Sequence, residues 1–462
     1  VVLPPRWEQE IPPQHRCQQC VGSRRLPSQG RDELCGKQTG FEFSRRQIGQ
    51  VDALRQPDAC RFQIINSLWT AQAARSMSIQ RAIALLAAVL RRGTVSCPDM
   101  GALSAKMDNL YDASIDYTVR KKGENQCVGF VASFIDDRYA PGGERLLEPA
   151  AALLGELICD PVTYHGRFVP EYFESEKTNL LEAIRSLIND KRDWADSRLL
   201  RALCDGEAYA VPRLGDEETV DKLQALKVYT QYRDLISTAP LEIIYSGSAD
   251  LERVKQALAA AFATLPREEV RVISTSVPHV CRESVQYVED VLDVTQGKLG
   301  MGFSCGSDDM PALLMGNTLF GGSSNSKLFL NVREKLSLCY YASSLYHRQK
   351  GLITVSSGIE FQNYQRAYDE IMAQLEAVQK GELEDWELEG ARSTLLNSYA
   401  TVGDSQGKLE NFYLGQAATG QHETPADLAR AIQDMTAERI CRAMSTVKLD
   451  TVYFLKGKEA EA

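Results

Sequence analysis

The sequence predicts an α+β protein made of two similar halves, each with long helices packed on an antiparallel sheet. Three observations lead to this prediction. A strand hairpin followed by helices occurs in the first half, the same order returns in the second, and a charged, proline-containing stretch lies between them at 266–282. A chain of 462 residues also suits two domains of ordinary size. We therefore expect one half at 61–265, a linker at 266–282 and a second half at 283–462.

In the first half, two helical segments precede the hairpin. Arg81 to Arg92 forms the first, and Pro98 opens the second, because proline is favoured at the first position of a helix. Alternating apolar residues at 115–119 predict a strand that turns at 121–123 into a second strand at 127–135. The remaining elements are helices at 144–158, 170–190, 194–204 and 249–263 and a short strand at 241–245.

The second half repeats this order. A strand at 339–346, a turn at 348–351 and a strand at 352–359 form a second hairpin. A long helix follows at 362–380, then further helices, and a closing strand at 451–455. The repetition predicts an internal duplication of one α+β unit.

Residues 1–60 differ from the rest of the chain, because they are rich in Arg, Gln, Pro and Cys and show no apolar period. They are either a disordered tail or a stretch translated in the wrong reading frame. They hold one cluster of metal-ligating types, His15, Cys17, Cys20 and Cys35. With a single Cys-x-x-Cys and no surrounding zinc module, we do not expect a metal site there. The other cysteines lie singly in apolar stretches and are interpreted as reduced, buried residues.

Composition limits the classes of function. Apolar residues make up 44% and charged residues 25%, which is a globular profile. The net charge of -10 argues against a nucleic-acid partner, whose phosphates need a basic surface. No apolar run reaches the roughly 20 residues that span a bilayer, so no membrane partner is expected. The first thirty residues lack the apolar core of a signal peptide, which makes the cytoplasm the expected compartment.

The stretch 332–340, Val-Arg-Glu-Lys-Leu-Ser-Leu-Cys-Tyr, resembles the Arg-Glu-x-x-x-Leu-x-Tyr signature in the second half of insulinase/pitrilysin zinc peptidases. Gly321 and Gly322 precede it where that family has its Gly-rich loop. Leu-Arg-Arg-Gly-Thr at 90–94 is similar to the end of the family's metal-binding helix. The resemblance covers about residues 80–462 and implies a duplicated insulinase-type fold with two homologous α/β-roll halves.

The family's zinc motif is the inverted His-x-x-Glu-His, completed by a glutamate on a later helix. Counted back from Gly93, the motif positions hold Ala84, Ala87 and Ala88, and the later glutamate position holds Ala183. Alanine offers no lone pair to a metal, and the five histidines are scattered along the chain. The sequence therefore predicts no zinc on this chain and no catalysis of its own.

Unlike the zinc-site positions, Arg333 and Tyr340 are expected to retain residue types that the family uses. Taken singly, Arg333 could be an ion-pair partner of Glu334 or Asp308, and Tyr340 an ordinary strand aromatic. Together they match the family's pair that contacts the substrate backbone and the oxyanion of the tetrahedral intermediate. The resemblance thus implies a non-catalytic subunit of a heterodimeric zinc metalloendopeptidase. It would bind substrate and support the transition state beside an active zinc-bearing homologous subunit, and an unfolded peptide would lie between the two.

Two other functions remain open. One is a purely structural scaffold subunit, as in the core proteins of respiratory complexes that share this fold. The other, an independent peptidase, needs a zinc site that the sequence lacks. The chain also resembles a subgroup of inactive bacterial members named for an association with elongation factor P 5-aminopentanol modification, but none of the residues above bears on that association.

Overall fold

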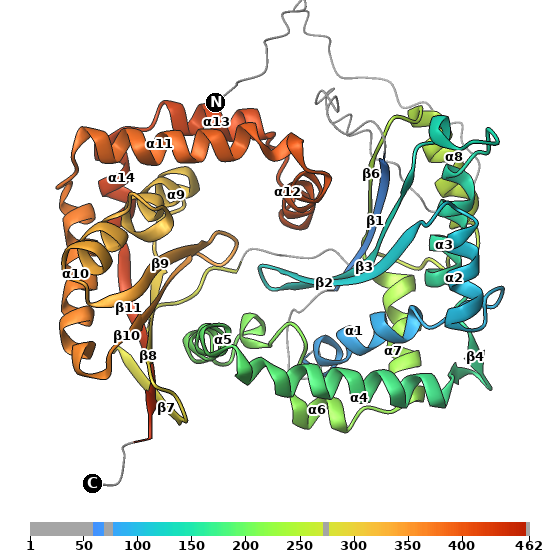
Figure 1. Ribbon diagram of the computed structural model, residues 1–462, viewed down its shortest axis with the longest axis horizontal. Coiled ribbons are helices and arrows are strands. Elements are labelled where there is room, and N and C mark those ends of the chain that lie inside the picture. The colour runs from blue at the N-terminus through green and yellow to red at the C-terminus, as the bar shows by residue number, and fades with distance from the viewer. Residues whose placement is uncertain (1–58, 69–76, 271–276, 459–462) are drawn as a thin grey trace, which may run out of the picture. The chain divides into compact units, whose positions relative to one another are not determined.

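The computed structural model describes residues 59–68, 77–270 and 277–458 (Figure 1). The predicted N-terminal segment 1–60 lies outside the described residues, apart from the last two, which begin the first strand. The cysteine cluster of that segment lies outside them as well. None of the described helices is long and apolar enough to cross a membrane.

The first half contains a four-stranded antiparallel sheet in the order β2-β3-β1-β6. The strands are β1 (Ala59–Leu68), β2 (Ser114–Lys122), β3 (Asn125–Ile135) and β6 (Leu241–Ser246). The helices are α1 (Met77–Leu90), α2 (Met100–Asp108), α3 (Leu147–Cys159), α4 (Pro170–Ser186), α5 (Lys191–Leu203), α6 (Glu217–Asp221), α7 (Ala225–Thr238) and α8 (Leu251–Ala261). A small hairpin joins β4 (Thr163–Tyr164) to β5 (Arg167–Phe168). The hairpin predicted from residues 115–135 is confirmed as β2 and β3, whereas the strand β1 was not predicted.

Local capping sets the helix boundaries in this half. Pro170 opens α4 at its first turn, as the sequence predicts. The break between α4 and α5 comes earlier than expected, because the carboxylate of Asp190 accepts hydrogen bonds from the backbone N–H groups of Arg192 and Asp193. Such a cap satisfies donors that have no partner inside the helix and starts α5 at Lys191.

The second half contains a five-stranded sheet in the order β7-β11-β8-β10-β9. The strands are β7 (Gln286–Leu292), β8 (Gly297–Cys305), β9 (Cys339–His347), β10 (Leu352–Ile359) and β11 (Val447–Gly457). The helices are α9 (Met310–Asn317), α10 (Tyr364–Lys380), α11 (Asp385–Ala400), α12 (Gln406–Thr419), α13 (Pro425–Gln433) and α14 (Ala437–Met444), with π-helical turns at Thr318–Gly322 and Leu328–Lys335. The expectation of an antiparallel sheet holds except for β7 and β11, which pair in parallel.

The two sheets confirm the predicted duplication. Without β7, the order β11-β8-β10-β9 matches the order β6-β1-β3-β2 of the first half. In both halves a first strand pairs with the second strand of a hairpin and with a closing strand near the end of the half. The strand β7 is therefore an addition at one edge of the second sheet.

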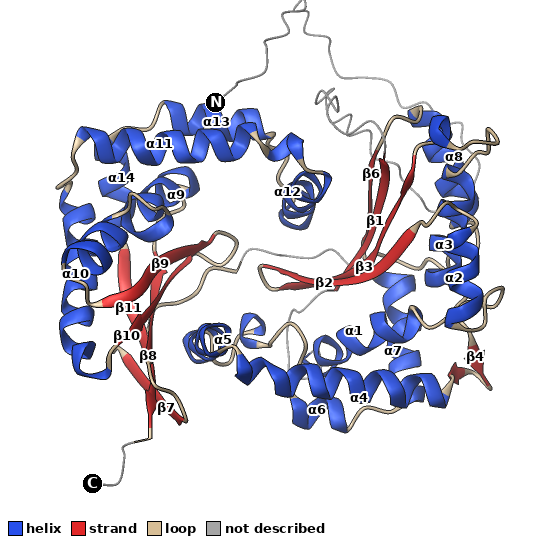
Figure 2. Ribbon diagram, viewed as in Figure 1, coloured by secondary structure: helices blue, strands red, loops and turns tan. Residues whose placement is uncertain are grey.

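Each sheet also packs against a helix of the other half (Figure 2). The helix α5 lies on β8 and β11, and α12 lies on the first sheet. The helix α5 approaches β8 closely because β8 has a glycine there: a Cβ at Gly302 would lie 2.7 Å from the Leu203 side chain. The linker expected at 266–282 runs between α8 and β7, and its residues 271–276 lie outside the described part.

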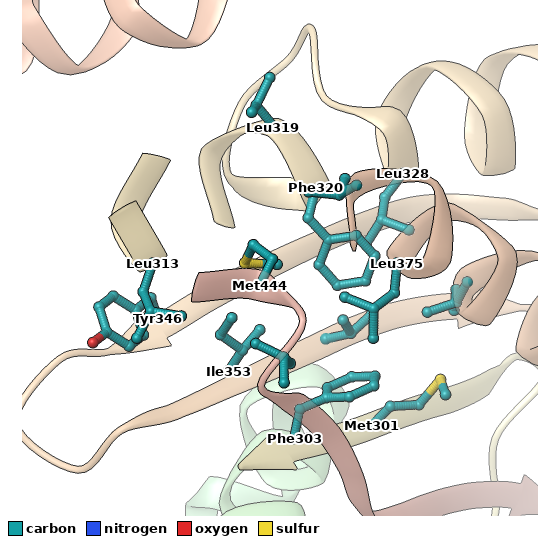
Figure 3. Close-up of a cluster of buried hydrophobic side chains, with 14 of the residues drawn as sticks. Met301, Phe303, Leu313, Leu319, Phe320, Leu328, Tyr346, Ile353, Leu375 and Met444 are labelled. Carbon is teal, nitrogen blue, oxygen red and sulfur yellow. The ribbon is translucent and has the colours of Figure 1, made fainter. Parts of the chain in front are cut away.

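The main hydrophobic cluster fills the second half between its sheet and its helices (Figure 3). Phe303 of β8 and Phe320 of the first π-helical turn meet edge to face with centroids 6.3 Å apart. Ile353 of β10 and Leu375 of α10 belong to the same cluster and are almost fully buried. This packing holds the segment that leads to Arg333 against the sheet, since Leu328 and Val332 are also buried in the cluster.

Candidate functional site

The four positions predicted to replace a zinc site lie on α1 and α4, two helices that pack against each other. Ala84, Ala87 and Ala88 are 2%, 0% and 5% exposed, so their methyl groups fill space in the interior of the first half. Ala183, on α4, is exposed. The assignment of these residues to a former metal site stays a prediction, but the donor set does not fit zinc, which needs nitrogen, sulfur or oxygen ligands.

One other group of possible metal ligands occurs in the described part of the chain: Cys204, Glu207 and His279, whose ligand atoms lie within 4.8 Å of one another. Two of the three are already engaged, because Nδ1 of His279 is 2.6 Å from a carboxylate oxygen of Glu207 and the other Glu207 oxygen contacts Lys350. Burial raises the pKa of the Cys204 thiol to about 12, which keeps it protonated and a poor ligand. The group is therefore part of an ion-pair network rather than a metal centre.

Arg333 lies near the end of the second π-helical turn, which a short loop at 336–338 connects to β9. The backbone N–H groups of Leu336 and Leu338 donate to the carbonyls of Asn331 and Val332 at 3.0 Å each, which fixes the loop. The Arg333 guanidinium stacks 4.6 Å from the centroid of Phe329 and lies 3.4 Å from the carboxylate of Glu334. The ion pair with Glu334 is exposed and weak, so the guanidinium stays accessible to a ligand.

Tyr340 lies on β9 and is 62% exposed. Its hydroxyl donates to the carboxylate of Glu360 at 2.6 Å, and this hydrogen bond raises the pKa of Tyr340. The structure thus places Arg333 and Tyr340 on one short, well-held segment, both at the surface. Their role in substrate contact remains a prediction.

The glycines of the predicted Gly-rich loop have a packing role. A Cβ on Gly321 would lie 2.7 Å from the backbone nitrogen of Ser344 on β9, and one on Gly322 would lie 2.9 Å from the Asn317 side chain. Gly321 is buried and Gly322 is exposed. Glycine at the first position is needed because the π-helical turn approaches the strand so closely.

The strand β2 forms an edge of the first sheet and borders a cavity of about 690 Å³. Residues 117–122 of the strand line it, together with Arg213, Leu214 and Asn411. Lys122 closes one side by donating to the Asn411 side chain of α12 at 2.7 Å. An edge strand beside an open groove can accept an extended peptide through main-chain hydrogen bonds.

Sequence reasoning missed the residues that join the two hairpin turns. Glu124 lies in the turn between β2 and β3, and Lys350 lies in the turn between β9 and β10. Lys350 was expected only as part of the turn at 348–351, and nothing was predicted for Glu124, yet Lys350 is 1% exposed and contacts the carboxylates of Glu124 and Glu207. Charged residues beside a turn give no local signal for such burial.

Comparison with known proteins decides the family. The model of the peptidase M16 inactive domain matches residues 222–395. A Bacillus subtilis protein named probable inactive metalloprotease YmfF is 35% identical over 383 residues, which cover 81% of this chain and 89% of that protein. This chain belongs to the M16 peptidase family. The resemblance to insulinase/pitrilysin peptidases is thereby confirmed.

Solved structures of other proteins have the same fold as this chain. A conserved protein from Enterococcus faecalis V583 superposes with a TM-score of 0.78 at 25% identity, covering 87% of this chain and 95% of that one. A peptidase M16 inactive domain from Pseudomonas fluorescens superposes with a TM-score of 0.70 at 17% identity, covering 87% and 94%. The chain is an inactive metalloprotease homologue of the M16 family with the insulinase-type fold.

Proposed function

We propose that this M16 homologue is the substrate-binding, transition-state-supporting subunit of a two-chain peptidase whose zinc is carried by a homologous partner. The observation that carries the proposal is the contrast between two sets of residues. The four positions that match the family's zinc motif are alanine, whereas the two that match its substrate-contacting pair, Arg333 and Tyr340, are intact and accessible.

The geometry of the pair supports this role. Arg333 offers a planar fork of five N–H donors, and Tyr340 offers one hydroxyl, both suited to a carbonyl oxygen that gains negative charge. Their present partners, Glu334 and Glu360, are side chains at or near the surface, so exchange for a substrate group costs little. A segment held by buried residues on both sides keeps the donors in place before substrate arrives.

The proposed substrate is an unfolded peptide. The edge strand β2 and its groove would bind an extended main chain, which a folded protein does not offer. The partner subunit would then have to supply the metal and the general base, since the positions for both are alanine here.

The test is reconstitution with a zinc-bearing M16 homologue from the same genome, assayed on a quenched fluorescent peptide. Arg333→Ala and Tyr340→Phe should each lower kcat by roughly ten-fold or more, because transition-state donors are lost. Arg333→Lys should restore little of the loss, since lysine lacks the planar fork. Gel filtration should show a heterodimer of normal size in every case.

Matched controls are Arg366→Ala on α10 and Tyr164→Phe on β4, both exposed and outside the segment. Neither should change kcat. Full activity of both Arg333→Ala and Tyr340→Phe would reject the catalytic-support role and leave a structural scaffold as the better interpretation.

A further inference from the structure

A second cavity, of about 650 Å³, lies within the first half and takes no part in the proposed function. It is bounded by the end of α4, by α5 and by the segment 209–217 that leads into α6. Its volume falls in the range of about 300–1,000 Å³ that is typical of small-molecule sites.

The walls of the cavity are mainly apolar and are fixed in place. Leu187 and Trp194 belong to the wall formed by the end of α4 and by α5, and Val211 and Pro212 belong to a second wall, formed by the segment 209–217. The second wall is tied to the sheet, because Nζ of Lys121 donates to the carbonyl of Tyr209 at 2.5 Å and to that of Val211 at 2.7 Å. Pre-formed apolar walls favour a rigid apolar ligand body.

Most charged groups of the lining already have partners. Arg185 pairs with Glu217 at 2.7 Å, and Arg198 forms a two-pronged pair with Asp290 at 2.8 and 3.2 Å. Two further carboxyl groups accept hydrogen bonds, that of Asp196 from Ser356 and that of Asp216 from Thr219. Asp193 is exposed in the first turn of α5, where the helix dipole favours a negative charge.

Apart from Asp193, the lining also contains hydrogen-bond donors that have no carboxylate partner among the described residues. The guanidinium groups of Arg201 and Arg213 are exposed and form no ion pair with a carboxylate in the described part of the chain. The indole nitrogen of Trp194 is buried without an acceptor among the same residues. A buried donor without an acceptor is costly, so its presence in a lining indicates a missing acceptor.

Lys121 adds a third positive charge to the lining of the cavity. Burial lowers the pKa of Lys121 to about 8, so its ammonium group still carries a charge at neutral pH. We propose that the cavity binds an apolar group that ends in a carboxylate, with the apolar body between Trp194 and Val211 and the carboxylate at Arg201 and Arg213. Arginine recognises a carboxylate through two parallel N–H···O bonds, which suits the planar ligand group.

This chemistry has two sources, the hydrophobic C-terminal residue of a peptide and a free aromatic or aliphatic acid. The inference stands apart from the proposed peptidase role, because it concerns binding to this chain alone.

The proposal is tested on the full chain by isothermal titration and by Trp194 fluorescence, with Trp194→Phe assigning the fluorescence signal. The probes are N-acetyl-phenylalanine, its amide, 3-phenylpropionate, and an octapeptide that ends in phenylalanine.

N-acetyl-phenylalanine should bind saturably, and its amide at least ten-fold more weakly, because the amide lacks the charge. Arg201→Gln and Arg213→Gln should each weaken binding about five-fold or more, a cost in line with a charged hydrogen bond. Arg366→Gln is the matched control, since Arg366 is also exposed and has no ion pair among the described residues. It should leave binding unchanged.

The arms of the titration separate the two sources. A peptide that binds more tightly than both small acids identifies a C-terminal residue as the ligand, whereas equal binding of 3-phenylpropionate and the peptide identifies a free acid. Equal affinity for the acid and its amide would overturn the proposal, as would the lack of saturable binding by every probe. Circular dichroism of the arginine variants checks that each is folded.

Discussion

The ammonium group of Lys350 lies between the carboxylates of Glu124 and Glu207, and its side chain is 1% exposed. Lys350 belongs to the turn between β9 and β10, and Glu124 belongs to the turn between β2 and β3. These turns occupy equivalent places in the two duplicated halves. The contact therefore joins the halves through their matching hairpins, and the carbonyl of Lys350 also accepts a hydrogen bond from the backbone of His279 at 3.1 Å.

Removal of this ammonium group should destabilise the protein strongly. Lys350→Met leaves Glu124 and Glu207 buried or half-buried without their cation, and such a change costs about 3–5 kcal/mol of unfolding free energy. Adding Glu124→Gln to Lys350→Met should recover part of the loss. Urea denaturation measures both.

Lys380→Met is the matched control, because Lys380 forms an exposed pair with Glu376 on α10. Its urea midpoint should stay close to that of the unchanged protein, because a solvent-exposed ion pair contributes little to stability. A Lys350→Met variant as stable as Lys380→Met would show that the buried contact contributes little.

His279 should make the stability of the protein depend on pH. Burial alone would lower its pKa, but hydrogen bonds to Glu207 and Asp450 outweigh burial, and the pKa of His279 is raised above its ordinary value of 6.5. Since the folded-state pKa is the higher one, the stabilisation is complete below pH 6.5 and is lost as pH rises through the folded value. The urea midpoint should therefore fall as the pH rises above 6.5 and through the folded-state pKa of His279.

The variant His279→Gln should lose most of this fall, because it cannot take up the proton. His165→Asn serves as the control, since His165 is exposed in a turn with φ of 49°, a conformation that asparagine tolerates. Its pH profile should follow that of the unchanged protein. An identical slope in His279→Gln would assign the pH dependence to other groups.

Two glycine substitutions should have opposite effects. Gly321→Ala places a methyl group 2.7 Å from the backbone of Ser344, and such overpacking costs about 1–3 kcal/mol. Gly390→Ala, inside α11, meets its nearest atom at 3.7 Å and should stabilise the helix by up to about 1 kcal/mol. Thermal unfolding of both variants checks the prediction, and a neutral Gly321→Ala would mean that the π-helical turn can move away from β9.

The chain should hold no zinc at Ala84, Ala87, Ala88 and Ala183, because methyl groups cannot coordinate a metal. Elemental analysis of the full chain and of a Cys17→Ser/Cys20→Ser/Cys35→Ser variant tests this, since the variant also removes the three thiols of the N-terminal cluster. The variant should contain no stoichiometric zinc. One tightly held zinc per chain in the variant would contradict the assignment of the α1 and α4 positions.

Much of the fold could be predicted from local patterns. The turn at 348–351 and the long helix that ends before Gly381 follow from turn residues and apolar periodicity. The first turn, predicted at 121–123, lies at 123–124, because β2 continues to Lys122. The strand β1 escaped prediction because it follows a segment without any period, although it pairs with two strands in the first sheet. The parallel pairing of β7 with β11 was also missed, since no local signal records the direction of a partner more than 150 residues away.

The sequence by itself determined that four positions cannot ligate a metal, and it predicted the likeness of the two halves. Ligand capacity belongs to the side chain, so alanine at 84, 87, 88 and 183 excludes those positions as zinc ligands in any fold. Only the tertiary structure decided that Lys350 is buried between two carboxylates and that Arg201 and Arg213 border one cavity. The physical reason is that burial and charge pairing depend on which distant segments pack together, and local periodicity does not carry that information.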